Sequence, residues 1–544
     1  MKNKLIRNIS ILLSTLLITQ TLLTGCGNKN NSAKVSSNIE DLKVDENGKI
    51  NGLMYEKGLP LVDKGDYEFS IFVDNSTPLE GQFMWQLLEN QTNVKVNVQQ
   101  NDYAIASEKY GLALSSGDYA DVIAGWLISG NDILKYGVDM GVFIPLEEYI
   151  EKYAPNIQKV LDIPGVREEM TAPDGHIYSI PYVDKAPKVH FNPFINQKWL
   201  DNLGLKMPTT TEEFREVLRE FKAKDANGNG NLNDEIPFSA DPNHRNLGRL
   251  AGWFGIPMTS GGFSLDEEGK LKFVANTEEY KKFVEYMASL NAEGLIDPEY
   301  FTQDRPTWRG KGDKNLYGVS VAYWSEDFKK VPLGEVPDYK PLPVLKGPNV
   351  DNPSWIPESD SIIVRRSQMV ITDKAKNPEV IIRWFDNLYE VDNSFQSKYG
   401  PFGITTEKIG ENHYKLYDRA KLDPEENEKY SFDNIFCQAL PRNIPIDIIQ
   451  EEENPKLYDE KKDTDELYEP YLLPKMKSYW VTEEYAAKLA EYSKAISDHI
   501  SKKTAEWVSG QADINKEWDS YCKQLEKLGL KEYIRINKEL VGEN

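Results

Sequence analysis

The apolar positions of the first folded stretch alternate with polar ones, and this alternation predicts strands. Tyr67–Asn75 is rich in aromatic and β-branched residues, and Val94–Gln99 alternates cleanly. Ala120–Trp126 is a short apolar run typical of a buried strand. Helical patterns fill both intervals, around Phe83–Leu88 and around Ala104–Ser115. The order strand, helix, strand, helix, strand indicates a mostly parallel sheet.

A second unit of the same kind begins near Lys188. Thr210 and Glu213 can form a capping box, after which apolar residues recur with the spacing of one helix face. Residues 450–470 are crowded with Asp, Glu and Lys, and we expect them to form an exposed loop. The remaining predicted elements are a helix over 277–293, strands over 315–324, 359–366 and 368–372, a helix over 377–389 and helices from 481 to the C-terminus.

The length and charge of the chain limit its class. A chain of 544 residues is too long for one ordinary hydrophobic core, so two or more domains are expected. The formal net charge of −23 argues against a nucleic-acid partner, because phosphates would be repelled. Apart from Cys26, the chain contains Cys437 and Cys522, for which we expect free thiols rather than a disulfide.

The first residues have the composition of a targeting segment. Three basic residues precede the apolar run Ile9–Leu23, which is too short and too mixed for a comfortable membrane span. The run ends in Leu-Thr-Gly-Cys, which resembles the bacterial lipobox, so residues 1–25 are predicted to be a signal peptide and Cys26 to carry the lipid. The alternative is a chance cysteine after an ordinary signal peptide. The polar stretch 26–45 is predicted to be a flexible tether, which would hold the folded body at the extracytoplasmic face of the cell membrane.

The stretch Asp225–Pro237 ("DANGNGNLNDEIP") suggests a cation site. Side chains with oxygen atoms occupy positions 1, 3, 5 and 7 of a candidate loop, and Gly228 and Gly230 permit left-handed turns. Calcium prefers six to eight oxygen ligands, so alternating Asp and Asn suit it. An EF-hand would place Glu at position 12, where this chain has Ile236. The loop is therefore EF-hand-like, and the alternative is an Asn-Gly turn that binds no ion.

Motifs for catalysis are lacking in the sequence. The five histidines show neither metal-ligand spacing nor a neighbouring nucleophile, and no phosphate-binding or dinucleotide-binding glycine pattern occurs. Two tryptophans are more informative, because Trp126 and Trp324 each end a predicted strand. In open α/β sheets, ligands bind outside the carboxyl ends of strands. An aromatic ring there can stack on the apolar face of a sugar, and the alternative role is core packing. For Trp199, Trp384, Trp507 and Trp518, inside helical patterns, we expect core packing.

Several stretches together resemble the family 1 extracellular solute-binding proteins of bacterial ABC importers, and in particular the large lipoprotein branch that includes alginate-binding proteins. The resemblance spans nearly the whole chain after Cys26. It is carried by Ser115–Trp126, Gly141–Leu161, Asp174–Val183, Phe194–Phe214, Asn291–Phe301 and Trp507–Leu530.

The resemblance implies a fold and a division of the chain. The fold class is α/β, a two-lobed periplasmic-binding-protein-like (type II) fold with an interlobe ligand cleft and a helical C-terminal region. Mapped onto this chain, the first (N-terminal) lobe would comprise residues 46–187 and 338–390. The second (C-terminal) lobe would comprise residues 188–337 and 391–544.

The resemblance also implies functional residues. Cleft aromatics would stack on sugars, and the candidates are Trp126, Tyr182, Trp253, Trp324 and Trp355. The branch carries a structural calcium loop, whose ligands here would be Asp225, Asn227, Asn229, Asn231, Asp234 and Glu235. The loop is one residue longer between Asn231 and Asp234 than its commonest form. No catalytic residue is implied.

The leading hypothesis is a monomeric lipid-anchored receptor that captures an oligosaccharide and hands it to ABC permease subunits in the membrane. A peptide or another polar solute is an alternative ligand for the same fold. A sensor subunit that presents ligand to a membrane kinase, and a surface glycosidase or lyase, are alternatives of a different class. The sequence does not specify the sugar, its linkage or its length.

Overall fold

The computed structural model describes residues 43–75, 77–185, 187–242, 247–259, 261–332, 335–358, 362–445, 447–454, 456–476 and 478–543. The predicted signal peptide, the lipidation site Cys26 and most of the predicted tether lie outside these residues. Two large clusters of buried apolar side chains define two lobes. The cluster of the first lobe runs from Ile50 to Val183 and from Met369 to Leu440. That of the second lobe runs from Val189 to Trp355 and from Tyr468 to Tyr533.

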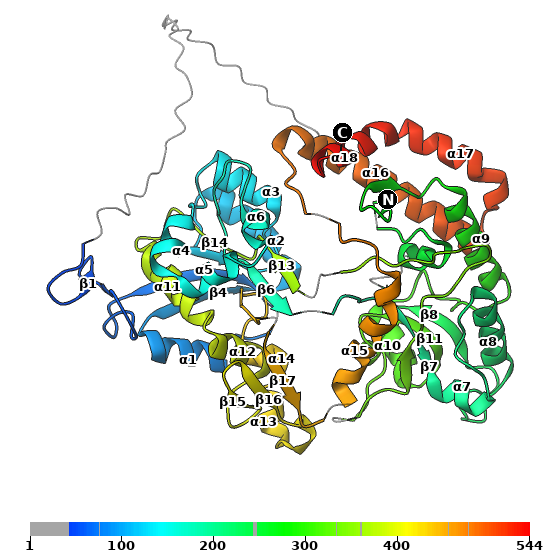
Figure 1. The fold of residues 1–544 in the computed structure, drawn as a ribbon, viewed down its shortest axis with the longest axis horizontal. Coiled ribbons are helices and arrows are strands. Elements are labelled where there is room, and N and C mark those ends of the chain that lie inside the picture. Colours follow the sequence, from blue (N-terminus) through cyan, green and yellow to red (C-terminus); the bar gives the residue numbers. More distant parts are fainter. Residues whose placement is uncertain are drawn as a thin grey trace, which may run out of the picture. The chain divides into compact units, whose positions relative to one another are not determined.

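The first lobe is built on a four-stranded sheet in the order β14-β5-β3-β4 (Figure 1). β3 (Glu68–Asp74) pairs in parallel with both β4 (Lys95–Asn101) and β5 (Val122–Ala124). β14 (Met369–Ile371) joins the edge of β5 in antiparallel orientation. Helices α1 and α2 connect the parallel strands, as the hydrophobic pattern predicted. Their bounds are Phe83–Thr92 and Tyr103–Ser116.

Helix α11 (Pro378–Leu388) completes the core of the first lobe, although it lies far along the chain from the other core elements. The helix begins with a proline in its first turn, where the missing N–H has no intrahelical partner to lose. Trp384 of α11 is buried and stacks on Trp85 of α1 with ring centroids 6.0 Å apart. The predicted packing role of Trp384 is thereby confirmed.

The second lobe is built on a four-stranded mixed sheet in the order β12-β7-β11-β8. β11 (Tyr317–Ala322) pairs in parallel with β8 (Ile236–Ala240) and antiparallel with β7 (Asn192–Asn196). β12 (Tyr339–Pro341) pairs with the other edge of β7. All six residues of β11 are buried, as expected for a strand that is covered on both faces.

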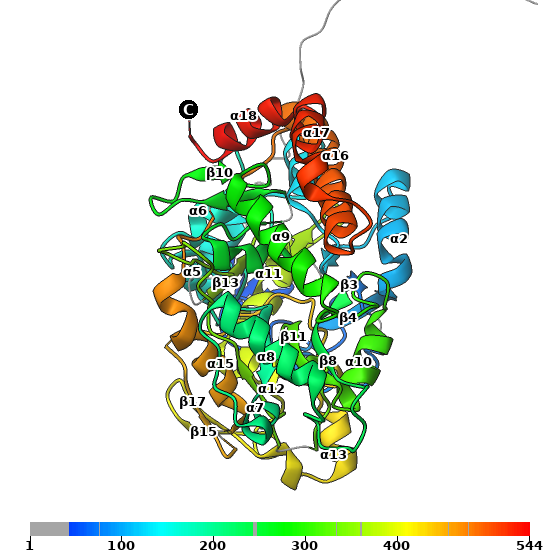
Figure 2. The ribbon, with the colours of Figure 1, turned by 90° about the vertical axis from the view of Figure 1, so that its right-hand side faces the viewer.

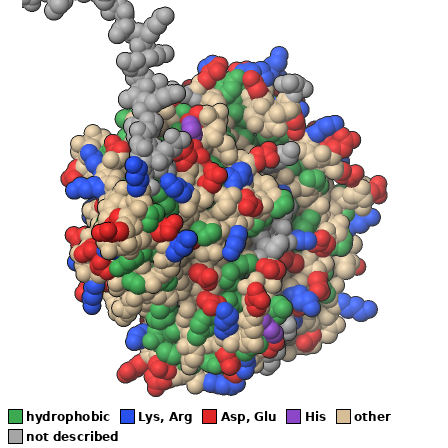
Figure 3. All heavy atoms as spheres, turned by 60° about the vertical axis from the view of Figure 1, so that its left-hand side comes forward, with side chains coloured by type: hydrophobic (Ala, Val, Ile, Leu, Met, Phe, Trp, Pro, Cys, Tyr) green, Lys and Arg blue, Asp and Glu red, His purple; other side chains and the backbone are tan. Residues whose placement is uncertain are grey.

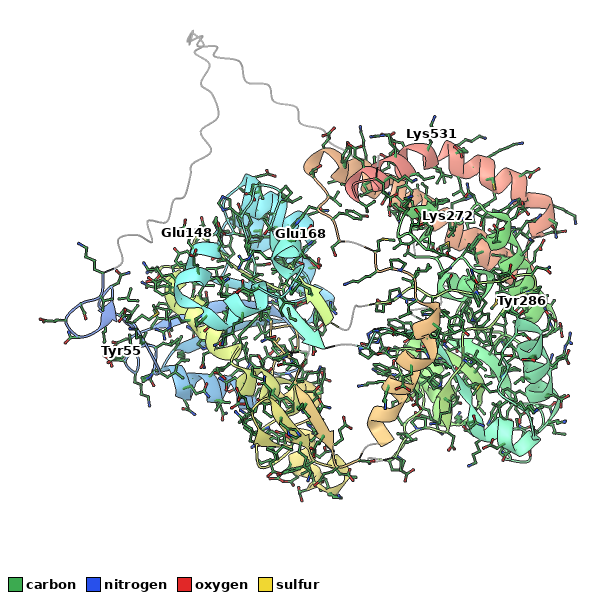
Figure 4. All side chains as sticks on the ribbon, in the orientation of Figure 1. Tyr55, Glu148, Glu168, Lys272, Tyr286 and Lys531 are labelled. Carbon is green, nitrogen blue, oxygen red and sulfur yellow. The ribbon has the colours of Figure 1, made fainter. Side chains whose placement is uncertain are left out.

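Helices α8 (Thr211–Ala223) and α9 (Glu278–Ala292) form part of the second core. The hydroxyl of Thr210 caps α8 by accepting a hydrogen bond from the Glu213 amide at 3.2 Å. The main partners of the Glu213 carboxylate are the backbone amide and the hydroxyl of Thr209, one residue before the cap. Tyr286, labelled in Figure 4, ties α9 to α8 through a buried 2.7 Å hydrogen bond from its hydroxyl to the Thr211 carbonyl.

Three helices complete the second lobe and confirm the predicted helical C-terminus. α16 (Glu483–Val508) contacts α9, α17 (Ile514–Lys527) and α18 (Leu530–Leu540), and the group lies together in both ribbon views (Figures 1 and 2). Trp507 and Trp518 are buried, as their helical spacing predicted.

The chain passes between the lobes at points that differ from the expected division. Residues 338–390 were expected in the first lobe, but β12 belongs to the sheet of the second. Residues 391–544 were expected in the second lobe, yet α12 (Val391–Tyr399) contacts α11 of the first. The predicted exposed loop over 450–470 is also wrong, because it contains α15 (Lys456–Tyr468), whose Tyr468 is buried in the second core. The positions of β12, α12 and α15 all depend on contacts between distant segments, which local composition does not encode.

The remaining elements are shorter. Those of the first lobe or packed beside it are β1 (Lys49–Ile50), β2 (Met54–Tyr55), α3 (Gly130–Asp132), a π-helical turn over 133–139, α4 (Glu147–Tyr153), α5 (Pro155–Leu161), α6 (Val166–Met170), β6 (Tyr182–Lys185), β13 (Ile362–Arg365), β15 (Thr406–Gly410), β16 (His413–Leu416), α13 (Pro424–Lys429), α14 (Phe432–Ile435) and β17 (Ile449–Glu452). Those of the second are α7 (Gln197–Leu203), a 3-10 helix over 247–254, β9 (Phe263–Leu265), β10 (Leu271–Phe273) and α10 (Arg305–Asp313).

The visible surface mixes acidic and basic side chains with small apolar areas (Figure 3). Within the described residues, no helix combines the length and the apolar character that crossing a bilayer requires. Both cysteines of this region, Cys437 and Cys522, are free thiols, as expected.

Candidate functional site

Trp126 follows the carboxyl end of β5 and is one of the few large apolar side chains exposed to solvent, at 42% of its surface. Its backbone N–H donates to both carboxylate oxygens of Asp74, at 3.0 and 3.2 Å. Asp74 is the last residue of the neighbouring strand β3. The ends of two parallel strands therefore hold an exposed indole ring in the position where α/β sheets bind ligands.

Cationic and aromatic groups surround the Trp126 ring. The guanidinium of Arg365, at the end of β13, lies 4.4 Å from the centre of the Trp126 ring and 5.8 Å from that of Tyr182. The two rings are 6.2 Å apart and tilted. The guanidinium of Arg442, a buried residue, also lies 5.8 Å from the centre of the Tyr182 ring. The structure thus brings together two of the predicted ligand-binding residues, Trp126 and Tyr182.

An ion pair anchors the polar end of Tyr182. Its hydroxyl donates to Asp184 at 2.9 Å, and both oxygens of Asp184 accept from the ammonium of Lys398 at 2.8 Å. Asp184 is buried and Lys398 mostly so. Because the carboxylate is engaged on both sides, it orients the phenol ring and leaves little freedom to the tyrosine side chain.

The second lobe carries its own aromatic cluster at the carboxyl end of β11. Trp324 is partly exposed and meets Tyr323 edge to face at 4.8 Å. His190 stacks on Tyr323 with ring centres 4.3 Å apart and meets Trp324 edge to face at 5.4 Å. The ammonium of Lys461, in α15, lies 4.9 Å from the centre of the Trp324 ring. The predicted residue Trp324 is therefore held in an aromatic group beneath a cation, as Trp126 is.

His190 is neutral near pH 7. Burial lowers the pKa of its imidazole to about 4, and the charges of Arg249 and Lys461 act in the same direction. Its Nε2 lies 3.4 Å from the Tyr323 hydroxyl. A neutral imidazole has one donor and one acceptor nitrogen, so it can orient the Tyr323 hydroxyl without adding charge to the aromatic cluster.

Two of the predicted ligand-binding residues lie in the core instead. Trp253 is fully buried and packs edge to face on Phe214 at 5.5 Å. Trp355 is also fully buried and packs on Tyr468 at 5.0 Å. A ring without solvent-exposed surface cannot stack on an incoming ligand, so the prediction of a binding role for Trp253 and Trp355 is wrong.

The Asp225–Glu235 loop is folded around its own side-chain oxygens. The carboxylate of Asp225 accepts from the amides of Asn229 and Gly230 at 3.0 and 2.8 Å. Asn227 and Asn229 accept from amides two residues further on, at 3.0 and 2.7 Å. The side-chain amides of the same two residues donate to Asp234, at 3.3 and 2.8 Å.

Glu235 has one carboxylate oxygen that the other residues of the loop do not satisfy. Its Oε1 accepts from the Ala226 amide at 3.1 Å, whereas its Oε2 is buried with no hydrogen-bond partner among the described residues. Burial is the main reason why the pKa of this carboxyl is raised. A buried carboxylate oxygen without a partner is costly, and a cation would satisfy it. The donor set of carboxylate and amide oxygens therefore fits a hard cation such as calcium.

Sequence reasoning missed several residues of the two aromatic clusters. Asp74 ends a predicted strand, which is a signal that could have identified it, because strand ends line ligand sites. Arg365, Arg442 and Lys398 carry no local signal, since pairings distant in sequence place them. The clusters hold rings, hydroxyls and cations rather than a nucleophile beside a base, so they are suited to stacking and hydrogen bonding.

The fold agrees with comparisons to known proteins. The family model for bacterial extracellular solute-binding proteins matches residues 75–393. Fructooligosaccharide ABC transporter substrate-binding protein FusA of Streptococcus pneumoniae is 31% identical over 564 residues, covering 97% of each chain. Its structure in complex with kestose has a TM-score of 0.75 at 30% identity and covers 87% of this chain and 99% of that one. The chain belongs to the bacterial extracellular solute-binding protein family, whose members bind solutes rather than transform them.

Two further relatives are informative. Lipoprotein LipO of Bacillus subtilis is 25% identical over 402 residues, covering 69% of this chain and 73% of LipO. The alginate-binding protein AlgQ2, solved without calcium ion, has a TM-score of 0.67 at 25% identity and covers 89% of this chain and all of AlgQ2. FusA has also been solved as an EF-hand mutant in complex with fructo-nystose. The predicted two-lobed type II fold is confirmed by these matches.

The lowered pKa of His190 makes stability depend on pH. The unfolded chain binds a proton as the pH falls below about 6.5, whereas folded His190 resists it until about pH 4, so the histidine destabilises the fold in this window. We expect the stability difference between wild type and His190→Gln, measured by chemical denaturation, to shift against wild type by about 2 kcal/mol from pH 7 to pH 5. If the stabilities of wild type and His190→Gln change with pH in parallel, His190 is protonated as easily in the folded as in the unfolded chain, and the prediction is wrong.

Proposed function

We propose that this protein captures an oligosaccharide between its lobes and delivers it to the permease of an ABC importer. The observation that carries the proposal is the pair of aromatic clusters at the carboxyl ends of β5 and β11, one on each lobe. The relative FusA, named for fructooligosaccharide transport and solved with kestose, supports a sugar as the ligand.

Trp126, Tyr182 and Trp324 would provide the binding surface. The exposed face of an indole ring offers apolar area to the C–H face of a pyranose or furanose, while cations nearby donate hydrogen bonds to sugar hydroxyls. Arg365 is exposed and lies over the Trp126 ring, so its side chain can move aside for the ligand or donate hydrogen bonds to it. Closure would be favoured when one ligand contacts both lobes, which shifts an open–closed equilibrium without any chemical step.

Kestose is the first ligand to test, in a thermal-shift series with other oligosaccharides on a soluble form starting after Cys26. Ligand at 100 times its Kd should add about 2.7 kcal/mol to the free energy of unfolding. Trp126→Ala should weaken binding about tenfold or more, the loss of roughly 1.4 kcal/mol of stacking.

Tyr119→Ala is the matched control for this experiment. Tyr119 is an aromatic residue beneath a cation, Lys374, at the opposite end of β5, and its loss should leave affinity unchanged. Chromatography of the incubated sugars should show no product. Binding of peptides but no sugars, or turnover of a sugar, would contradict the proposal.

We further propose that the Asp225–Glu235 loop binds a structural calcium ion. Asp225, Asn227, Asn229, Asn231, Asp234 and Glu235 would supply the oxygen ligands. The unpartnered buried Oε2 of Glu235 supports this proposal from the chain itself, and the EF-hand named for FusA supports it from a relative. The ion would hold the turn between α8 and β8, and it would take no part in ligand chemistry.

Removal of calcium should destabilise the second lobe. Calcium at 100 times its Kd stabilises the folded state by about 2.7 kcal/mol, so a chelator should lower the melting temperature by several degrees. Asp225→Asn and Glu235→Gln, which remove charge but little volume, should abolish the response to calcium. Asp266→Asn is the matched control, because Asp266 makes the same kind of turn by accepting from the Glu268 and Lys270 amides. A chelator without effect on wild type would contradict a structural ion.

We also propose that Cys26 carries a lipid anchor that keeps the protein at the extracytoplasmic face of the membrane. The signal-like segment ending in Leu-Thr-Gly-Cys and the relationship to a protein named lipoprotein support this proposal. Each buried CH₂ of an acyl chain contributes about 0.8 kcal/mol to membrane affinity.

Anchoring can be tested by expression in a bacterium supplied with an alkyne-bearing fatty acid. Wild type should take up the label and sediment with membranes, while Cys26→Ala should do neither. Cys437→Ala should behave as wild type, because Cys437 is buried in the first core. Label on the Cys26→Ala protein would refute the assignment.

A further inference from the structure

The backbone between β5 and Trp126 passes unusually close to Asp74. The parallel register pairs Val73 of β3 with Ala124 of β5, so the residues that follow each strand leave the sheet together. Gly125 adopts a φ of 141°, a conformation that favours glycine. A Cβ atom at this position would lie 1.6 Å from Oδ1 of Asp74. Glycine is therefore required for the carboxylate to reach the next peptide group.

Asp74 is a buried carboxylate that accepts hydrogen bonds from a backbone amide. Only 4% of its surface is exposed, and both oxygens accept from the Trp126 N–H. Within the part of the chain that the structure describes, no lysine or arginine forms an ion pair with it. Burial raises its pKa to about 6, and the Trp126 amide acts against this increase. A carboxylate buried without a cation is costly, and a neutral acceptor would serve a purely structural turn at lower cost.

The other contacts of Trp126 leave its ring weakly held. Arg365 lies over the ring but is itself exposed. The side chain of Trp126 also makes a hydrogen bond with Tyr103, which is 49% exposed. Both of these partners are exposed side chains, and the ring of Tyr182 lies tilted at 6.2 Å, whereas Asp74 belongs to a strand in the middle of the sheet. The hydrogen bonds that tie Trp126 to the central strand of the sheet are therefore those from its backbone N–H to Asp74.

We propose that Asp74 is a positioning residue that fixes the Trp126 indole as a preformed platform for a sugar ring. This inference rests on the proposed oligosaccharide function. A side chain that is ordered before the ligand arrives loses less conformational entropy on binding, so affinity rises without a new contact. Gly125 is part of the same device, since it allows the carboxylate to meet the amide.

Fluorine NMR of protein labelled with 5-fluorotryptophan tests the platform without any ligand. The Trp126 resonance is assigned by its absence in Trp126→Phe. In Asp74→Asn and in Gly125→Ala it should shift and broaden while the other tryptophan resonances stay in place. Asp121→Asn is the matched control: Asp121, at the opposite end of β5, also accepts from a strand amide, that of Ser70 at 2.7 Å. Its substitution should leave the Trp126 resonance unchanged.

Titration with kestose gives the second readout. Asp74→Asn should bind kestose about tenfold more weakly than wild type, and Asp121→Asn as well as wild type does. Wild-type affinity should fall as the pH drops from 7 to 5, because the Asp74 carboxyl becomes protonated, and the Asp74→Asn profile should be flat. The titratable groups near Asp74 are Tyr103 and Cys437, whose pKa values burial raises, so neither changes charge in this range.

The outcomes separate this inference from the proposed function. If wild type fails to bind kestose, the choice of ligand is wrong, and the ligand-free spectra alone decide the role of Asp74. An unchanged Trp126 resonance in Asp74→Asn overturns the positioning role, even if affinity falls. Equal losses of affinity in Asp74→Asn and Asp121→Asn also overturn it, because they would reflect general destabilisation of the sheet.

Discussion

The parallel pairing of β3 with β5 is the constraint on which the aromatic cluster around Trp126 depends. It brings the carboxyl ends of two strands to one edge of the sheet, with Asp74 on one and Gly125 and Trp126 after the other. The second lobe repeats the arrangement, since β11 pairs in parallel with β8 and ends beside Trp324. In each lobe the sheet buries the strand and exposes the residue that follows it. The same topology therefore produces a stable core and a surface for a ligand.

The pattern of apolar residues was sufficient to predict the parts of the fold that are local. The alternation in Tyr67–Asn75 and Val94–Gln99 and the short apolar run before Trp126 correspond to β3, β4 and β5. The amphipathic spacing after Thr210 corresponds to α8. These signals are reliable because the periodicity of a strand or helix is written in consecutive residues. The position of Trp126 at a strand end follows from the same information.

Contacts between distant segments could not be predicted in this way. Trp253 and Trp324 are both tryptophans near the end of an apolar run, yet one lies in the core and the other is partly exposed. Only packing against Phe214, 39 positions before Trp253 in the chain, separates the two cases. Arg365 reaches Trp126 because β13 pairs with β6, and α15 is a helix because Tyr468 enters the second core. The charged composition of residues 450–470 suggested a loop, because composition alone does not show that one face of a helix is buried.

The route of the chain has a consequence for biosynthesis. The first core includes residues up to Leu440, and the second begins at Val189 but needs Tyr533 near the end. Neither lobe is encoded by one uninterrupted stretch, so the first stays incomplete until about four fifths of the polypeptide has been made. Domains often fold in order during synthesis, but here both cores are completed only late in the synthesis of the chain. Half-length fragments of this protein are therefore poor candidates for autonomous folding, and neither aromatic cluster has a finished lobe behind it until late in synthesis.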